Sequence, residues 1–189
     1  MFWLLLIFSY FLGSVSFAII ISKIMGIKDP RLSGSGNPGA TNMLRVAGTR
    51  LAILTLIGDL LKGILPVIIA RALDLTLPQQ AWVGLGTIIG HLYPIYFKFK
   101  GGKGVATAAG MLLITSPIVG IGAIATWGIT FYWSRISSLS ALLALLTTLT
   151  LTSIMAMSIF IPILILCLLI LWRHRRNLHD LITGHERHF

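Results

Sequence analysis

Residues 104–172 read GVATAAGMLLITSPIVGIGAIATWGITFYWSRISSLSALLALLTTLTLTSIMAMSIFIPILILCLLILW, and Arg135 is the single charged residue among them. The stretches before and after Arg135 are each longer than the roughly 20 residues that a helix needs to cross a hydrocarbon core about 30 Å thick. In the whole chain 56% of the residues are hydrophobic and 11% are charged, whereas an average soluble domain has roughly 25% charged residues. We therefore expect an all-α integral membrane protein.

The positions of the basic residues predict how the chain is oriented. Lys and Arg gather after three apolar runs, in segments 23–50, 98–103 and 173–187. By the positive-inside rule these segments are cytoplasmic. The first apolar run, 2–22, has no basic residue before it and no small-residue cleavage pattern after it, so we expect a retained anchor. The N-terminus is then outside and the C-terminus is cytoplasmic.

The same rule predicts how often the chain crosses the membrane. If run 104–134 crossed once and run 136–172 twice, the last basic cluster would lie outside. Two crossings in each run avoid this, with breaks expected at Pro117 and in the Thr/Ser-rich stretch 147–158. The sequence therefore predicts a single domain, residues 1–189, of about seven short transmembrane helices.

A glycine-rich segment, SGSGNPGATN at 33–42, follows the first run. Its glycines let backbone amides converge on an anion, and Arg45 can grip a phosphate with its planar guanidinium. The segment adds side-chain donors: Ser35, Asn37, Thr41 and Asn42. Residues 34–39 also satisfy GxGxxG, but they lie between transmembrane helices and not in a βαβ unit, so a dinucleotide site is rejected. A flexible connector remains the alternative to an anion cradle.

A second segment, GHLYPIYFKFKGGKGVAT at 90–107, combines glycines with lysines before the next span. Amides at a helix N-terminus favour an anion, and Lys103 adds a full charge. The glycines at this entry are Gly101, Gly102 and Gly104. Phe97 stands where a Walker A loop has its first glycine, so nucleotide binding is unsupported. The segment predicts a phosphate site, and His91 is expected to pack inside the preceding span.

The third segment, RHRRNLHDLITGHE at 173–186, follows the last span. His174 and Asn177 are three residues apart, so on a helix they share a face and can address one ligand. The HxxxxD pair of several acyltransferases is absent, because Asp180 is one residue too far from His174. The tail histidines lack thiolate or well-placed carboxylate partners, so no metal or cofactor is expected. Cys167, the single cysteine, excludes a disulfide within the chain.

Asp59 and Lys62 lie three residues apart within the second apolar run. Ionisable residues inside a membrane are functional suspects, but an internal ion pair is an equally good interpretation. The pair also leaves open a second class of function, an anion or phosphate transporter. Clustering of the motifs on one face and the lack of an internal repeat argue against a transporter. A structural scaffold would leave the motifs unexplained.

The three segments together resemble the bacterial acyl-phosphate-dependent glycerol-3-phosphate acyltransferase family of inner-membrane enzymes. The similarity extends over the whole chain, although Leu178 and Asp180 stand where the family usually carries Ile and Arg. The residues that match are Gly34–Asn42 with Arg45, Gly90–His91 with Pro94 and Phe99–Thr107, and Arg173–His174 with Asn177, Gly184 and Glu186.

The resemblance implies transfer of a fatty acyl group from acyl phosphate to the first hydroxyl of glycerol 3-phosphate, which gives lysophosphatidate and phosphate in phospholipid synthesis. The implied catalytic residues are Ser35, Arg45, Lys103, His174 and Asn177. The implied substrate-binding residues are Gly36, Asn37, Asn42, Gly101, Gly102, Gly104 and, more weakly, Ser138. The expected partners are the two substrates and membrane lipid. We expect a monomer in the bacterial inner membrane, with no nucleic-acid partner.

The residue types suit this reaction, because both substrates carry phosphate and need fixed cations and amide donors. Acyl phosphate is a mixed anhydride with a good leaving group, so positioning and charge stabilisation remain as the main requirements. We expect direct attack by the hydroxyl, with Lys103 and Arg45 stabilising the phosphates. Ser35 and Asn177 would orient the carbonyl and the leaving group. Either His174 or a departing phosphate oxygen would take the proton.

Overall fold

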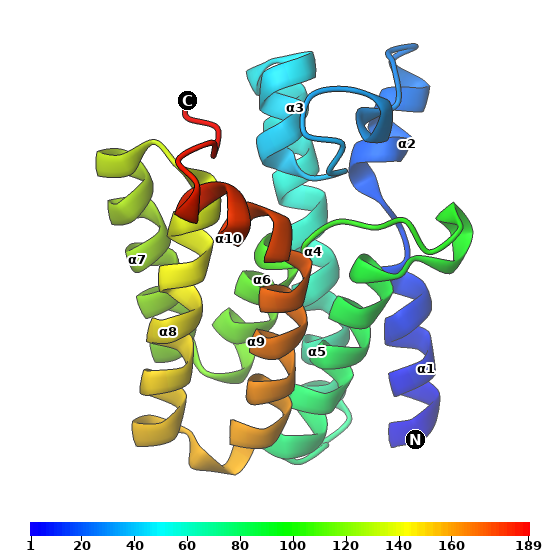
Figure 1. The fold of residues 1–189 in the computed structure, drawn as a ribbon. Helices are drawn as coiled ribbons and strands as arrows, with labels where there is room; N and C mark the ends of the chain where they lie inside the picture. The colour runs from blue at the N-terminus through cyan, green and yellow to red at the C-terminus, as the bar shows by residue number, and fades with distance from the viewer.

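The computed structural model describes residues 1–189 as an all-helical bundle (Figure 1). The α-helices are α1 (Phe2–Gly13), α2 (Phe17–Ile24), α3 (Ala40–Ala47), α4 (Thr49–Ala72), α5 (Leu77–Leu92), α6 (Val105–Thr115), α7 (Pro117–Ser134), α8 (Ser137–Met155), α9 (Phe160–Arg173) and α10 (Arg175–Ile182). Three single turns of 3₁₀ helix complete the chain: η1 (Pro30–Leu32), η2 (Ile95–Phe97) and η3 (Met157–Ile159).

The glycine-rich and basic segments gather at one end of the bundle. Figure 1 shows α3, α10 and the C-terminus at this end, and the loop that follows α5 runs toward them. The N-terminus and the turns between α4 and α5, α6 and α7, and α8 and α9 lie at the opposite end. Three segments that are far apart in the sequence are therefore neighbours in space.

The helix breaks predicted within residues 104–172 are confirmed. α6 ends at Thr115 and α7 begins at Pro117, which is favoured at a helix start because its missing N–H has no acceptor there. α8 ends at Met155, inside the stretch where a turn was expected. At each break the chain reverses direction, and the basic C-terminal end of the following helix returns to the end of the bundle where the polar loops lie.

The helices differ in their capacity to cross a membrane. By length and composition, α4 and α8 are each long and apolar enough to cross a membrane on their own. Two pairs of consecutive helices also meet these criteria together: α1 with α2, bent by 43°, and the η3–α9 segment with α10, bent by 59°. Two to four spans are therefore supported by these criteria, and large apolar side chains such as Trp3, Ile129 and Leu168 are exposed on the outside of the bundle.

Small residues let neighbouring helices touch backbone to backbone. A Cβ on Gly13 of α1 would lie 2.0 Å from the Thr87 carbonyl oxygen of α5, and one on Gly63 of α4 would lie 2.1 Å from the Thr107 carbonyl oxygen of α6. Such close approach is how membrane helices pack when water exclusion does not drive them together. The first contact joins α1 to α5, and the second positions α6 against α4, next to the glycine loop that precedes α6.

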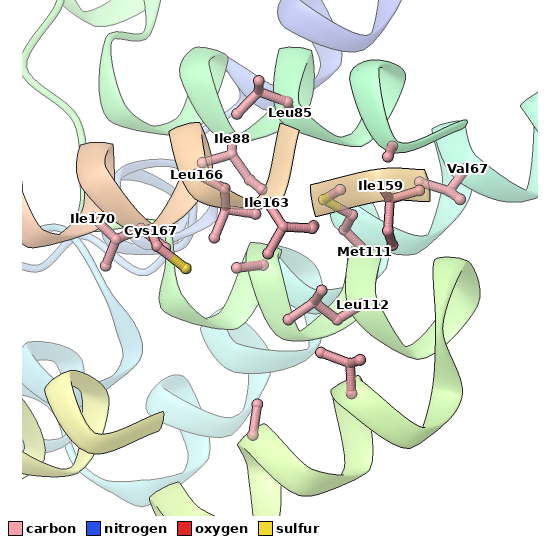
Figure 2. Close-up of a cluster of buried hydrophobic side chains, with 14 of the residues drawn as sticks. Val67, Leu85, Ile88, Met111, Leu112, Ile159, Ile163, Leu166, Cys167 and Ile170 are labelled. Atoms are coloured by element: carbon pink, nitrogen blue, oxygen red, sulfur yellow. The ribbon is translucent and has the colours of Figure 1, made fainter. Parts of the chain in front are cut away.

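A core of buried apolar side chains joins α5, α6 and α9 (Figure 2). Ile88, Met111 and Leu166 are fully buried there, and Cys167 is buried beside them. This core anchors the last turn of α9, after which the third polar segment begins.

Candidate functional site

A cavity of about 1120 Å³ opens among the three polar segments. It brings together residues from all three thirds of the chain, as the sequence predicts for one shared site. The predicted site residues that line it are Ser35, Gly36, Asn37, Asn42, Arg45, Gly101, Lys103, Gly104, Ser138, His174 and Asn177. Gly102 is the one predicted site residue that does not line it.

Asn42 shapes the first glycine-rich segment from within. Its side-chain oxygen accepts from the Ser35 amide at 2.8 Å, and its amide nitrogen donates to the carbonyls of Pro30 at 2.9 Å and Ser33 at 3.1 Å. Asn42 is 1% exposed, and all three bonds are internal. The predicted substrate-binding role is therefore better read as holding the loop, while Ser35 is exposed at the cavity.

Arg45 projects from α3 and is covered by the tail of the chain. Its guanidinium lies 4.2 Å from the centroid of the Phe189 ring and donates to the Arg187 carbonyl at 3.4 Å. The Phe189 amide in turn donates to the Arg135 carbonyl at 3.0 Å, at the start of α8. The tail thus spans from α3 to the turn between α7 and α8.

In the glycine loop before α6, two carbonyls accept hydrogen bonds, whereas most of the amides have no protein acceptor. Arg173 donates to the Gly102 carbonyl at 3.1 Å and to the Gly101 carbonyl at 2.8 Å. The Gly102 amide donates to the His91 carbonyl at 3.1 Å, so this amide is not available to a ligand, contrary to expectation. The other amides of the loop donate to no protein oxygen: those of Gly101, Lys103 and Gly104. They form a cradle for an anion.

The Lys103 ammonium is held at this cradle by the third segment. It donates to the Asn177 side-chain oxygen at 2.5 Å, and the Asn177 amide donates to Glu186 at 2.8 Å. Asn177 therefore positions Lys103, and its side chain keeps one N–H and one lone pair that a ligand can use. An ammonium has three donors, so two remain for a ligand.

Burial lowers the pKa of Lys103 from 10.5 to about 8. The carboxylate of Glu186 opposes this shift, whereas the charge of Arg173 adds to it. Desolvation disfavours the charged form of a lysine. Lys103 is still mostly protonated at neutral pH, with a charge that an anionic ligand would stabilise.

His174, which follows α9, is buried beside Lys103. Its Nδ1 lies 2.8 Å from the Ile170 carbonyl oxygen, which fits a proton on Nδ1 and an unprotonated Nε2. Burial, and secondarily the charge of Lys103, lowers the pKa of His174 to about 4. The ring is neutral at physiological pH.

Ser138 offers a hydroxyl with no protein partner. It is 6% exposed, lines the cavity and makes no hydrogen bond. The adjacent Ser137 hydroxyl lies 3.1 Å from that of Thr41, which joins α8 to α3. Ser138 is therefore placed to meet a ligand.

Below the polar mouth most of the cavity wall is apolar. Its walls there come from α4, α6, α7 and α8, with side chains such as Leu112, Ala123, Trp127, Ala144 and Leu145. One continuous space thus has cations and amides at one end and hydrocarbon surface at the other. It suits a ligand that joins a phosphate to an aliphatic chain.

Several contacts at the site escape prediction from the sequence. Asp59 and His91, two buried residues of membrane helices, also line the cavity, and the expected Asp59–Lys62 ion pair is present at 3.0 Å. The contacts of Glu186 and Phe189 depend on how the tail folds back, for which the sequence carries no periodic signal. No three His, Cys, Asp or Glu side chains are placed to hold a metal ion.

Comparison with known proteins identifies close relatives. A family model described as glycerol-3-phosphate acyltransferase matches residues 3–184. A glycerol-3-phosphate acyltransferase of Pseudomonas fluorescens strain Pf-5 is 60% identical over 189 residues, and one of Pseudomonas putida strain KT2440 is 58% identical. In both pairs the match covers 100% of each chain.

The bundle also matches solved structures. Two crystal structures of PlsY (YgiH), an integral membrane glycerol 3-phosphate acyltransferase, superpose on it. The glycerol 3-phosphate form gives a TM-score of 0.94 at 36% identity, and the lysophosphatidic acid form gives 0.92 at 35%. Each match covers 100% of this chain and 95% of the other.

Proposed function

Because this chain belongs to the glycerol-3-phosphate acyltransferase family, we propose that it transfers a fatty acyl group from acyl phosphate to the sn-1 hydroxyl of glycerol 3-phosphate. The products are lysophosphatidate and inorganic phosphate. That the chain is a membrane acyltransferase of phospholipid biosynthesis follows from the family. The proposal adds the acyl donor, the position acylated and the residues that act.

One observation carries the proposal: the Lys103 ammonium and three free amides share a cavity with a long apolar wall. The cradle binds a phosphate, and Arg45, which also lines the cavity, supplies a second fixed cation. The apolar wall accommodates the fatty chain. Both substrates can therefore present their phosphates to cations while the acyl carbonyl lies between them.

The donor is inferred from what the leaving group needs. Phosphate departs readily from the mixed anhydride of an acyl phosphate, so the reaction needs little acid catalysis. Nearby cations stabilise the charge that develops on the departing oxygens. The described site supplies that stabilisation through Lys103 and Arg45, with no nucleophile–base pair of the kind an acyl-enzyme would require.

In the proposed step the hydroxyl oxygen of glycerol 3-phosphate attacks the acyl carbonyl carbon directly. The new ester bond forms, the bond from the carbonyl carbon to the phosphate oxygen breaks, and the hydroxyl proton passes to the departing phosphate. The phosphate oxygen gains negative charge as this bond breaks, which raises its proton affinity, whereas burial lowers the pKa of His174 to about 4. The departing phosphate is therefore the better proton acceptor. Ser35 and Ser138 orient the carbonyl, and Asn177 positions Lys103.

The arrangement in the membrane is also proposed. Seven spans, formed by α1 with α2 and by α4 through α9, would place the N-terminus outside and the C-terminus in the cytoplasm. The site then faces the cytoplasm of a bacterial inner membrane, within a single domain of residues 1–189 that acts as a monomer. Gathering of the basic loops at one end of the bundle supports this orientation.

The test is lysophosphatidate formation by purified protein in detergent, with glycerol 3-phosphate and either acyl phosphate or acyl-CoA as sole donor. Lys103→Ala should lower the rate about 100-fold or more, as expected for removal of a charge-stabilising donor. Lys28→Ala is the matched control, since Lys28 is exposed and does not line the cavity. It should keep the wild-type rate.

Product from acyl phosphate alone, lost in Lys103→Ala, supports the proposal. Product from acyl-CoA would keep the acyltransferase and overturn the donor. A folded wild-type protein that makes no product from either donor would contradict the proposal as a whole.

A further inference from the structure

Asp59, Lys62 and His91 form a buried polar cluster that the proposed chemistry does not use. Their exposed fractions are 2%, 3% and 6%, and they lie on the neighbouring helices α4 and α5. Charged groups at membrane depth are costly and persist where they have specific work. Their contacts indicate what that work is.

Lys62 closes the break between α1 and α2. Its ammonium donates to the carbonyls of Gly13 at 3.0 Å and Val15 at 2.7 Å, and pairs with the Asp59 carboxylate at 3.0 Å. Backbone carbonyls at a broken helix need donors, and at membrane depth water cannot supply them. The role of Lys62 is therefore structural, and Asp59 balances its charge.

His91 lies between Asp59 and the glycine loop. Its Nδ1 is 3.6 Å from the Asp59 carboxylate, and its carbonyl accepts from the Gly102 amide at 3.1 Å. On the other side of the ring, a Cβ on Gly102 would lie 2.1 Å from His91 Nε2. The backbone of Gly102 has no left-handed φ, so glycine is needed here for space and not for conformation. The ring is the surface on which the loop rests.

Arg173 holds the same loop from its carbonyl side. It binds the carbonyls of Gly101 and Gly102, and all peptide bonds are trans. In a trans peptide the N–H points opposite to the C=O. Fixing the Gly102 carbonyl on Arg173 therefore directs the Lys103 amide away from Arg173, provided that His91 keeps the loop pressed in place.

We propose that His91 is a positioning residue for glycerol 3-phosphate. Its ring sets the path of residues 101–104, so that their free amides and the Lys103 ammonium hold the phosphate. The inference rests on the proposed function, because it assigns the cradle to this substrate. In this proposal the His91 ring contacts neither the acyl chain nor the bond that breaks. Replacing the ring should therefore change the affinity for glycerol 3-phosphate.

The experiment is a double-mutant cycle between the ring and the loop. His91→Ala removes the support, and Gly102→Ala pushes the loop off the ring. Each should raise KM for glycerol 3-phosphate about tenfold or more, with kcat and KM for acyl phosphate nearly unchanged. In the double variant the vacated ring space accepts the new methyl group. Its KM should therefore stay close to that of either single variant and fall well short of the product of the two increases.

His91→Gln is the conservative variant, because its amide can occupy the place of Nε2. It should recover much of the affinity lost in His91→Ala. Calorimetric titration of glycerol 3-phosphate alone gives a second readout that needs no acyl donor. A wild-type protein that binds but makes no lysophosphatidate would sink the proposed function and leave this inference standing.

The inference is overturned if folded His91→Ala has the wild-type KM for glycerol 3-phosphate. It is also overturned if the KM increase in the double variant equals the product of the two single increases. If His91→Ala does not give a single sharp peak in gel filtration, Gly102→Ala decides, because it disturbs the same contact from the side of the loop. An unchanged KM for glycerol 3-phosphate in folded Gly102→Ala would also overturn the inference.

Discussion

Lys103 carries a charge that the fold makes sensitive to pH near neutrality. Burial lowers its pKa to about 8, and the folded protein stabilises the neutral form relative to a free lysine. In the proposed mechanism the charged form, present below this pKa, is the one that binds phosphate. Affinity for glycerol 3-phosphate is therefore complete below the pKa and is lost as the pH rises through it.

We expect kcat/KM for glycerol 3-phosphate to fall as the pH rises through about 8. A bound phosphate dianion favours the ammonium, so kcat should fall only at a higher pH. Lys103→Arg provides the comparison, because a guanidinium stays charged throughout this range. Its profile should be flat above pH 8 even if its overall rate is lower. The same fall in Lys103→Arg would assign the titration to another group.

His174 can be tested as a proton acceptor separately from its hydrogen bond to Ile170. His174→Asn places an amide nitrogen near the position of Nδ1 and preserves the bond to that carbonyl. With the departing phosphate as acceptor, we expect this variant to keep measurable turnover, reduced about tenfold by looser packing. Loss of all turnover with normal glycerol 3-phosphate binding would make His174 the base.

The sequence predicts which residues meet at the site better than it predicts what each one does. Charge and glycine patterns predict that Lys103 and its loop lie beside the other two polar segments, and all three segments line one cavity. They do not reveal that the Gly102 amide is already bonded or that Asn42 and Asn177 are engaged internally. Those roles depend on side-chain partners from distant segments, which no local pattern records.

At the scale of helices, breaks were predictable and short polar helices were not. Proline chemistry and a polar stretch located the ends of α6 and α8. In contrast, α3 lies in a segment whose composition suggests a loop, and α10 was expected only as a continuation of the last span, from which it is bent by 59°. Both helices are stabilised by contact with the bundle, as when the Thr41 and Ser137 hydroxyls join α3 to α8.

The contact between α4 and α6 should be intolerant of even one methyl group. Gly63→Ala would press a Cβ onto the Thr107 backbone, which cannot move as a flexible side chain can. We expect a loss of about 1–3 kcal/mol in stability, seen as a lower midpoint of thermal unfolding in detergent. Gly128→Ala in α7 is the control, since nothing lies within 4 Å of its Cβ position. It should match or exceed wild-type stability. Equal midpoints for both variants would contradict this packing.

For the molecule as a whole, the arrangement separates two environments within one cavity. Cations and amides gather at the end where the polar loops meet, and apolar walls continue between α4, α6, α7 and α8. A water-soluble substrate and a lipid-like one can therefore meet without either leaving the environment that dissolves it. A buried core joins α5, α6 and α9, the helices next to the second and third polar segments (Figure 2).

The folded tail has a practical consequence for producing the protein. Phe189 stacks on Arg45 and its amide is bonded to the Arg135 carbonyl, so an affinity tag that follows Phe189 would begin at the rim of the cavity. We expect a bulky tag at this position to lower kcat/KM several-fold relative to the same tag before Met1, which lies at the opposite end of the bundle. Proteolytic removal of the tag should restore the activity. Equal activity of the two tagged proteins would show that the tail can leave the rim without loss.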